Sequence, residues 1–407
     1  MIYKEEKHCR ICGGKLIPIL DLGELYISDF VRPGEEGIKA PLVVAECENC
    51  GLVQLKHTVN SDSMYKKHYW YRSGLNKSMV KDLKNVVESA EKLIELENGD
   101  TVIDIGTNDG TLLSLYKNKN LLNTVGFDPA PNLAELASKN CANFINDYFT
   151  GENPLFWRTS VITSIAMLYD LPNPNFFVEN VKICLDKAGI WIIQFTDLLS
   201  MLKVNAIDNL CSEHLELYRL FDVKNLVERH GLEIFKVEYN KVNGGSIRIY
   251  VSFPGAYSVD GSVEKSLIEE KKYLEIDSIV KLYDRFEIYK RKINYFLTRF
   301  PKEKVFAMAA STKGNTLLQL MGWDKDQIRA IGEINRDKIG LVTAGTSIPI
   351  IPEEKIFKYE PNLIVVLAWH FKTTFVNTLK NYVENGGLVL FPLPRPHIIS
   401  SEGVIKL

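Results

Sequence analysis

The sequence lacks a long hydrophobic run. No uninterrupted apolar stretch approaches the roughly 20 residues that a membrane-spanning helix needs. The polar N-terminus, MIYKEEKHCRICGG, also lacks the apolar core of a signal peptide. These absences predict a cytoplasmic protein without a membrane partner, and no segment has the pattern of an exposed apolar helix, so we expect a monomer.

The sequence also lacks an excess of charge of either sign. Its 49 basic and 51 acidic residues give a formal net charge of -2. That balance offers no electrostatic reason to expect a nucleic-acid partner or binding to an anionic membrane. The 407 residues, of which 46% are hydrophobic, are enough for two or three globular domains with buried cores.

Cysteine is scarce, and most of it is grouped. Seven cysteines are an odd number in a chain without an export signal, so a disulfide framework is not expected. Four of them form the pairs Cys9-x-x-Cys12 and Cys47-x-x-Cys50. Four converging thiolates complete a tetrahedral zinc shell and leave no open position for catalysis. We therefore predict a structural zinc; a redox pair and two coincidental pairs are the alternatives.

The hydrophobic pattern divides the chain into three blocks. Helical spacing over 79–98 precedes short apolar strands that alternate with helical stretches, which predicts a parallel sheet covered on both faces. These strands lie at 101–106, 123–129, 160–166 and 189–195. The block then closes with two strands, 232–240 and 246–254, joined by the turn KVNGG, which is too short for a crossover helix.

An α/β sheet that ends in an antiparallel hairpin is typical of class I methyltransferases, and simple dinucleotide-binding folds do not build one. Residues 262–298 are charged and helical in pattern, and β/α alternation restarts near residue 304. We therefore predict an α/β protein with a zinc-binding β domain (1–75), a Rossmann-like methyltransferase domain (76–250) and a second α/β domain that binds substrate (251–407).

The stretch VIDIGTNDGTLL (102–113) is a candidate cofactor loop. Asp104 ends a strand, and Gly106 and Gly110 follow with a spacing that differs from G-x-G-x-x-G. The glycines allow a ligand to approach the backbone closely. Asp104 suits the amino group of an amino-acid moiety better than it suits a pyrophosphate. Asn108 and Asp109 belong to the same predicted site.

Two later strand ends extend this site. Asp128, in VGFDPAPN, lies where a carboxylate can bind both hydroxyls of a ribose. Asp147 and Phe149, in NDYFT, are expected to flank an adenine. Together these pieces predict an S-adenosylmethionine pocket. A glycine turn with solvated carboxylates is the alternative, but it has to explain all three features at once.

Five motifs in order complete a resemblance that covers nearly the whole chain: CRICGG…CENCGLVQ, VIDIGTNDGTLL, SEHLELY, GGSIRIYV and AASTKGNTLLQ…AGTSIPI. The chain resembles the three-domain sugar C-methyltransferases that act on nucleotide-linked deoxysugars. The resemblance implies a zinc domain, an S-adenosylmethionine domain and a C-terminal α/β domain. It also implies a substrate between them, with its nucleotide held largely by the outer two domains.

The resemblance places the chemistry on Glu213 and His214, which follow the fifth strand of the sheet. In that family the substrate is typically a 4-keto-6-deoxy sugar on a nucleoside diphosphate. A base removes the proton α to the ketone, and the enolate carbon takes the methyl group. His214, with an ordinary pKa near 6.5, is the expected base, and Glu213 is expected to orient its ring. Tyr71, or Tyr69 as second choice, is expected to hydrogen-bond the enolate oxygen.

Two positions depart from the antibiotic-sugar branch of that family. Cys211 occupies a tyrosine position, and Asp170 occupies a histidine position; both are expected to face the sugar. They point to a different sugar or a different acceptor atom. O-methylation of a similar substrate and a zinc-stapled binding protein without chemistry are the alternative functions. The sequence does not identify the sugar, the nucleotide or the methylated atom.

Loops of the C-terminal block are the predicted nucleotide site. STKGNT places Ser311, Lys313 and Asn315 at a helix N-terminus, which offers free N–H groups to phosphate. A plain capping turn is the alternative there. Thr346 in AGTSIPI and His370 in LAWHF lie in loops at later strand ends. A simple loop histidine is the competing interpretation of His370.

Overall fold

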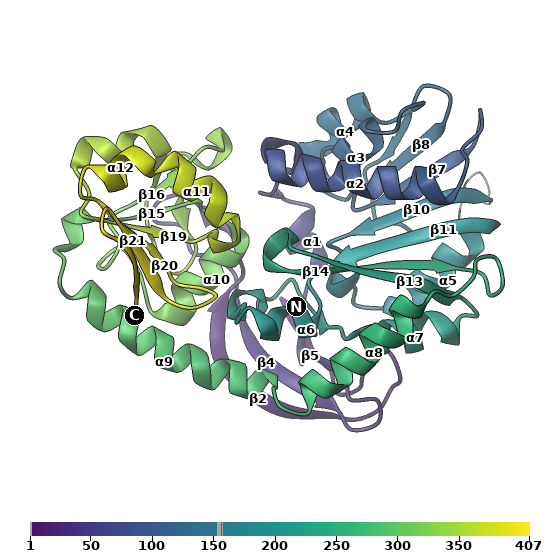
Figure 1. The fold of residues 1–407 in the computed structure, drawn as a ribbon, viewed down its shortest axis with the longest axis horizontal. Helices are drawn as coiled ribbons and strands as arrows, with labels where there is room; N and C mark the ends of the chain where they lie inside the picture. The colour runs from purple at the N-terminus through teal and green to yellow at the C-terminus, as the bar shows by residue number, and fades with distance from the viewer. Residues whose placement is uncertain (1, 153–155, 157) are drawn as a thin grey trace.

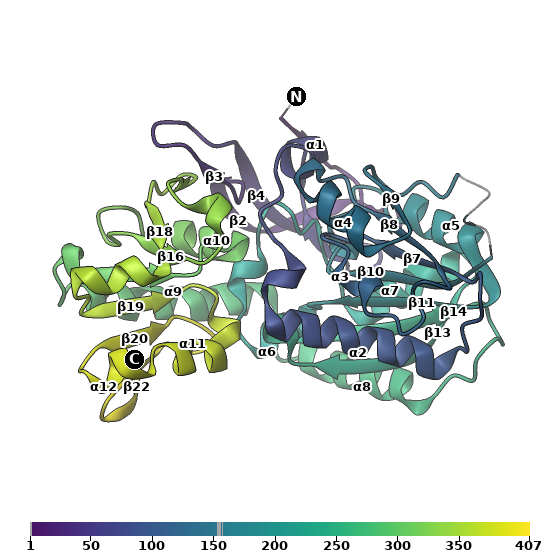
Figure 2. The same ribbon diagram turned by 90° about the horizontal axis from the view of Figure 1, so that it is seen from above.

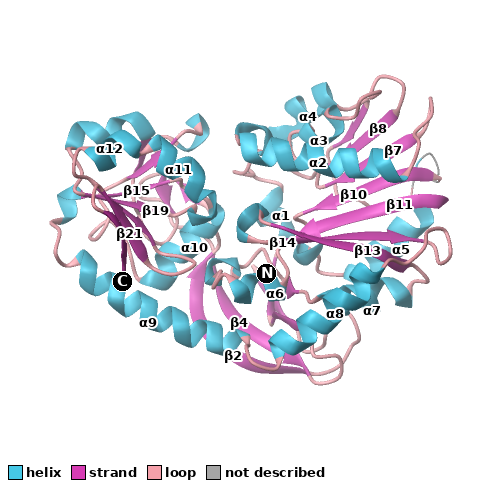
Figure 3. Ribbon diagram, viewed as in Figure 1, coloured by secondary structure: helices cyan, strands magenta, loops and turns pink. Residues whose placement is uncertain are grey.

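The computed structural model describes residues 2–152, 156 and 158–407. Two seven-stranded sheets lie on opposite sides of the molecule, and N-terminal strands β2 and β4 lie between them (Figures 1 and 2). Helices cover both large sheets, as the secondary-structure colouring shows (Figure 3). The sequence therefore predicted the class of fold correctly: α/β, with a small β domain at the N-terminus.

The N-terminal domain is a four-stranded sheet of order β12-β5-β4-β2. Its strands are β2 (Leu16–Tyr26), β4 (Lys39–Cys47), β5 (Val53–Leu55) and β12 (Glu216–Leu217). β12 comes from the segment that directly follows Glu213 and His214, and it pairs antiparallel with β5. The sheet that carries the zinc cysteines is therefore completed by the methyltransferase segment of the chain.

Other short N-terminal elements surround this sheet: β1 (Tyr3–Glu5), β3 (Phe30–Val31), β6 (His57–Val59) and α1 (Ser61–Tyr65). β1 pairs with β6, and β3 pairs with β17 (Val342–Thr343) of the C-terminal domain. Strand pairing thus ties the N-terminal domain to both of its neighbours.

The central sheet has the order β9-β8-β7-β10-β11-β14-β13. Its strands are β7 (Thr101–Ile105), β8 (Asn123–Phe127), β9 (Asn143–Ile145), β10 (Thr159–Ile165), β11 (Leu185–Phe195), β13 (Glu233–Asn240) and β14 (Ser246–Ser252). β14 inserts antiparallel between β11 and β13, while the remaining strands run parallel. This arrangement confirms the predicted class I methyltransferase fold.

Alternation along the strands explains why helices cover both faces of this sheet. Val102 packs with α2 (Lys77–Leu93) on one face, and its neighbour Ile103 packs with α5 (Pro174–Cys184) on the other. Successive side chains of a strand point to opposite faces, so a strand buried on both sides is apolar throughout. Shorter helices complete the layers: α3 (Thr111–Ser114), α4 (Ala134–Asn140), α6 (Leu198–Lys203) and α7 (Leu220–Arg229).

Two helices, rather than one, bridge the large domains. The predicted helical region 262–298 divides into α8 (Gly261–Leu274) and α9 (Ile279–Leu297), and Ser278 caps the second helix through the Lys281 amide. α9 buries one apolar face that includes Leu282 and Phe286. The charged residues are therefore the solvent-facing side of two amphipathic helices that run below both domains (Figure 1).

The C-terminal sheet repeats the doubly wound plan. Its order is β18-β16-β15-β19-β20-β21-β22, and the first five of these strands are parallel. The strands are β15 (Val305–Met308), β16 (Ile331–Glu333), β18 (Ile350–Pro352), β19 (Leu363–Val366), β20 (Leu388–Phe391), β21 (His397–Ser400) and β22 (Gly403–Lys406). Its helices are α10 (Thr312–Met321), α11 (Lys372–Thr378) and α12 (Lys380–Glu384).

Chain order reverses at one point in each large sheet. The reversal lies between β7 and β10 in the central sheet and between β15 and β19 in the C-terminal sheet. Ligands of open α/β sheets bind in the crevice at this switch point, outside the carboxyl ends of the strands. Loops from both switch points line one cavity. Within the described part of the chain, no helix has the length and apolar character needed to cross a membrane.

Candidate active site

The four paired cysteines come together at one end of the N-terminal sheet. Sulfur–sulfur distances are 3.7 Å for Cys9–Cys50, 3.3 Å for Cys12–Cys47 and 3.5 Å for Cys12–Cys50. A tetrahedron with zinc–sulfur bonds of about 2.3 Å has edges of roughly 3.8 Å, so the four sulfurs fit zinc. The Gln54 side chain donates to the Cys9 sulfur at 3.2 Å, the kind of outer contact that orients a metal ligand.

A cavity of about 500 Å³ lies between the central and C-terminal domains. Most of the predicted site residues line it, contributed by the cofactor loop, the aromatic loop, the Glu-His segment and the C-terminal loops. They are Tyr69, Tyr71, Asp104, Gly106, Asn108, Asp128, Asp147, Phe149, Asp170, Glu213, His214, Ser311, Lys313 and His370. One cavity therefore joins motifs that lie far apart in the sequence.

Asp128 is the best-organised carboxylate of the cofactor half. One of its oxygens accepts from the Asn108 amide at 2.8 Å, and the other accepts from the Ala130 amide at 2.9 Å. Both oxygens keep lone pairs for a ligand at the end of β8. Burial raises the pKa of this carboxyl group to about 6, although the two amide bonds oppose the shift. The position fits a pair of ribose hydroxyls.

Asp104 lies deeper, at the end of β7. Its carboxylate accepts from the Thr163 hydroxyl at 2.6 Å, and burial raises its pKa to about 7. Gly106 follows with φ of +75°, a left-handed conformation that favours glycine. A cationic group on a ligand would keep Asp104 ionised at neutral pH, because an opposite charge favours the charged form.

Two of the predicted cofactor residues lie outside the cavity, and two others line it while they also contact neighbouring side chains. Asp109 and Gly110 do not line the cavity. The Asp109 carboxylate accepts from the Gly74 amide at 2.8 Å, and Gly110 is packed so closely that a Cβ would meet Asn140 at 2.7 Å. Both residues shape the loop. Asp147 lies at the exposed rim, 2.9 Å from Lys66, and Phe149 packs edge-on against Phe127.

His214 lies across the cavity with its ring fixed. Its Nδ1 is 2.9 Å from the Asn209 carbonyl oxygen. A carbonyl only accepts, so Nδ1 carries the hydrogen, and the neutral ring keeps its lone pair on Nε2. Burial lowers the pKa of His214 to about 3, and the nearby Lys313 charge adds to this shift. The Tyr169 ring lies over it, with centroids 4.2 Å apart.

Glu213 does not orient this ring. Among the described residues no hydrogen bond joins its carboxylate to His214, and the Asn209 carbonyl takes the orienting role that the sequence assigned to Glu213. Burial, with a smaller contribution from the charge of Asp29, raises the pKa of Glu213 to about 7. Cys211 does not line the cavity, but its sulfur lies within 4.8 Å of ligand atoms of Glu213 and His214.

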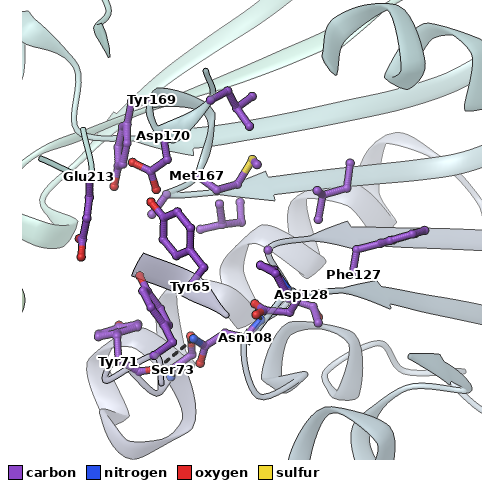
Figure 4. A pocket seen from close by; sticks show the side chains of 18 of the residues that line it. Tyr65, Tyr71, Ser73, Asn108, Phe127, Asp128, Met167, Tyr169, Asp170 and Glu213 are labelled. Carbon is purple, nitrogen blue, oxygen red and sulfur yellow. Dashed lines mark hydrogen bonds between the residues drawn. The ribbon is translucent and has the colours of Figure 1, made fainter. Parts of the chain in front are cut away.

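Aromatic side chains and a carboxyl group form the wall beside Glu213 (Figure 4). The Tyr65 hydroxyl points toward Asp170, and sequence reasoning missed Tyr65 because α1 carries no recognisable motif. Burial, with Glu213 and Glu216 nearby, raises the pKa of the Asp170 carboxyl group well above its usual range.

The aromatic loop 68–79 is pinned to the cofactor half of the site. The Asn132 side chain bonds both the amide and the carbonyl of Tyr69, at 2.9 and 3.0 Å. The Asn108 side chain donates to the Tyr71 carbonyl at 3.0 Å. The hydroxyls of Tyr69 and Tyr71 remain protonated at neutral pH, since desolvation raises the pKa of both above the ordinary value.

The C-terminal half of the cavity is formed by Ser311, Thr312, Lys313, His370 and Phe371. Two other predicted substrate residues do not line it. The Asn315 amide donates to the Asp29 carbonyl at 3.0 Å and so joins two domains. The Thr346 hydroxyl is bonded to that of Thr343 at 2.6 Å within a turn. Sequence position placed both near the site, but their side chains are used in structural contacts.

The carboxylate at the end of β8 gives a direct test of the cofactor site. Asp128→Ala is expected to weaken S-adenosylmethionine binding by roughly 10- to 100-fold, because hydrogen bonds to a charged group contribute about 1.5–3 kcal/mol. Affinity should also fall as the pH drops through about 6, where Asp128 becomes protonated. Isothermal titration calorimetry measures both effects. Asp147→Asn, at the exposed rim, is the matched control and should change the Kd little.

The strand order and the carboxylates at the strand ends define a class I S-adenosylmethionine-dependent methyltransferase. Three family profiles match in order: "Putative zinc binding domain" (9–65), "Methyltransferase domain" (78–237) and "C-methyltransferase C-terminal domain" (241–394). The chain therefore contains, in this order, the zinc-binding, methyltransferase and C-methyltransferase C-terminal domains that these profiles describe. S-adenosylmethionine is its methyl donor, and a structural zinc occupies the four-cysteine site.

One relative aligns with this chain over nearly its whole length. The chain is 27% identical over 414 residues to C-methyltransferase NovU of Streptomyces niveus, with 98% of each chain covered. Magnesium protoporphyrin IX methyltransferase of Synechocystis PCC 6803 with bound S-adenosylmethionine aligns at 13% identity and a TM-score of 0.33, covering 43% of this chain and 79% of that chain. A methyltransferase of Aquifex aeolicus aligns at 17% identity and 0.31, covering 43% and 97%.

Proposed function

We propose that this enzyme methylates a carbon next to a ketone in a sugar linked to a nucleoside diphosphate. The observation that carries the proposal is the single cavity that joins the cofactor loop, the Glu213–His214 pair and the N-terminus of α10. A substrate that reaches all three parts needs a compact reactive end and an anionic end. A nucleotide-linked sugar has both.

His214 is the proposed base. His214 lines the cavity, and its Nε2 bears the lone pair because the Asn209 carbonyl holds the hydrogen on Nδ1. The ring is neutral at cellular pH, so the proton-accepting form is fully populated. Ionised Glu213 then stabilises the imidazolium that forms when the ring takes the proton. When bound, S-adenosylmethionine supplies the electrophilic methyl group.

The tyrosines and Asp170 are proposed to stabilise the enolate oxygen and to orient the sugar. The tyrosine hydroxyls are hydrogen-bond donors that line the cavity, where such donors can stabilise developing negative charge. Tyr71 and Tyr69 remain the two candidates for the enolate contact. Asp170 with Tyr65 forms a second polar contact region for the sugar ring (Figure 4).

Lys313 is the proposed contact for the diphosphate. It lines the cavity at the first turn of α10, and it makes no ion pair within 4.0 Å among the described residues. Ser311 caps the helix by accepting from the Gly314 amide at 3.0 Å, which leaves other first-turn amides free. A helix N-terminus with an unpaired lysine is a suitable environment for phosphate oxygens.

The substrate class is tested by incubating the enzyme with S-adenosylmethionine and a panel of nucleotide-linked keto sugars. Mass spectrometry should show a product heavier by one CH₂ with at least one of them. Without cofactor, the substrate should exchange the hydrogen next to its ketone for deuterium from solvent. An enzyme that forms a methylated product without any exchange would refute the enolate route and favour a hydroxyl acceptor.

The phosphate contact predicts a selective effect of Lys313→Met. The KM for the nucleotide sugar should rise by about tenfold or more, since a charge-assisted bond is lost. The Kd for S-adenosylmethionine should stay the same, because Lys313 lies on the other side of the cavity. Steady-state kinetics and calorimetry make the comparison. An equal increase in the KM for the nucleotide sugar and in the Kd for S-adenosylmethionine would contradict the assignment of Lys313 to the phosphate.

A further inference from the structure

The segment before the Glu213–His214 pair is held by the C-terminal domain. Asp208 is fully buried in the 3-10 turn Ile207–Asn209, and its carboxylate accepts from the Trp369 indole N–H at 2.8 Å. The next residue, Asn209, supplies the carbonyl that fixes the His214 ring. The contact between domains, Asp208 with Trp369, therefore lies one residue away from the contact that sets the tautomer of His214, the Asn209 carbonyl.

Trp369 lies between this turn and the hairpin loop 241–245 of the central domain. It is 5% exposed, and it follows β19 at the switch point of the C-terminal sheet. Its ring packs so closely on Gly244 that a Cβ there would lie 2.7 Å from the ring. Its neighbour His370 lines the cavity, as does Asn243 beside Gly244. Trp369 thus contacts two central-domain loops from directly behind the predicted nucleotide site.

Lys313 connects the same place to the cavity electrostatically. Burial raises the pKa of Asp208, and the Lys313 charge opposes that shift; burial lowers the pKa of His214, and the same charge adds to that lowering. Asp208 keeps a second oxygen buried and without a hydrogen-bond partner among the described residues. The indole N–H is therefore the side-chain contact that holds this carboxyl group in place, and its loss would leave a buried polar group without that hydrogen bond.

We propose that Trp369 is a positioning residue for the base. Through Asp208 it holds the Ile207–Asn209 turn in place. The C-terminal domain, which is proposed to bind the nucleotide, thereby keeps His214 in the tautomer whose Nε2 accepts the proton. The binding of the unreactive end of the substrate is thereby used to organise the reacting end, as binding energy from remote groups often is. This inference rests on the proposed function for its catalytic meaning, but not for its structural test.

The structural test is nitrogen-15 NMR of the histidine rings in Trp369→Phe, with the His214 signal assigned from His214→Asn. Phenylalanine removes the N–H together with outer carbons of the ring that pack on Gly244, so the control has to carry the same change of side chain. The matched control is Trp323→Phe, which removes an equally buried indole bond, 2.6 Å to Asn294, elsewhere in the same domain. Trp369→Phe should move the His214 ring nitrogens away from the pure Nδ1–H tautomer, and Trp323→Phe should leave them in place. Unchanged His214 signals in Trp369→Phe would overturn the proposal.

Kinetics supply the second measurement. When kcat is calculated per S-adenosylmethionine-binding site, Trp369→Phe should lower it at least tenfold, and Trp323→Phe should not. Asp208→Asn keeps an oxygen that accepts from the indole, so it should retain the His214 tautomer. Equal kcat values for the two tryptophan variants would also overturn the proposal. If the tautomer shifts but the wild-type enzyme methylates no nucleotide sugar, the positioning role stands and the proposed substrate fails.

Discussion

His214→Asn is expected to lower kcat by about 10²- to 10⁴-fold, the usual contribution of a positioned general base. The asparagine keeps a polar side chain of similar length but has no lone-pair nitrogen for the proton. S-adenosylmethionine should bind with the wild-type Kd, which calorimetry measures. His230→Asn is the matched control, because that histidine bonds Glu179 and Asn175 and does not line the cavity. Retained turnover in His214→Asn would refute the assigned base.

The pH profile of the wild-type enzyme tests whether Glu213 is the catalytic partner of His214. The pKa of His214 is about 3 and that of Glu213 is about 7. Activity should therefore rise with pH through about 7, as Glu213 ionises and becomes able to stabilise the imidazolium. The histidine itself contributes no titration in this range. In Glu213→Gln this rise in activity with pH should disappear, and kcat at high pH should be lower than that of the wild-type enzyme. If the rise in activity with pH persists in Glu213→Gln, Glu213 is excluded as the group whose ionisation causes it.

Cys9→Ser is expected to release the zinc and to unfold the N-terminal domain, which would abolish activity. Structural zinc contributes on the order of 10 kcal/mol of folding free energy in small domains. The melting temperature should fall by on the order of 10 °C, followed by circular dichroism, while atomic absorption reports the metal. Methyl transfer should be lost because β12, which directly follows the Glu-His segment, pairs within the same sheet.

The control for that substitution is Cys141→Ser. Cys141 is partly exposed, lies outside the four-cysteine cluster, and bonds the Ala137 carbonyl in a way that a hydroxyl can replace. It should leave the zinc content at one per chain. A Cys9→Ser enzyme that keeps its zinc, its melting temperature and its activity would contradict a structural metal at this site.

Local patterns were sufficient to predict the class of fold. The alternation in TVIDI places Val102 and Ile103 on opposite faces, and the short KVNGG turn forces the antiparallel β14. The cysteine spacing led to the zinc site for a similar reason, because the ligands of each pair are close in the chain. Such features depend on neighbours within a few residues, which a single sequence displays.

Contacts between distant segments were not predictable. Nothing in the letters GluLeu marks Glu216–Leu217 as a strand of the zinc domain. Tyr65 reaches the cavity from a five-residue helix, and Asn315 turns toward Asp29 instead of a ligand. The helical pattern of 262–298 hid a break before Ser278, where Asp277 and Ser278 cap a second helix. These outcomes depend on tertiary packing, which overrides local preference.

The pairing of β12 with β5 and of β17 with β3 constrains how the protein is made. The ribosome releases the zinc domain first, but its sheet lacks an edge strand until Glu216–Leu217 has been synthesised. The pairing of Phe30–Val31 waits still longer, for Val342–Thr343. Domains usually fold in the order of their synthesis. Here the N-terminal domain emerges first, but its strands pair with segments of the two domains that are synthesised later. The nascent chain therefore exposes unpaired strand edges for most of its translation.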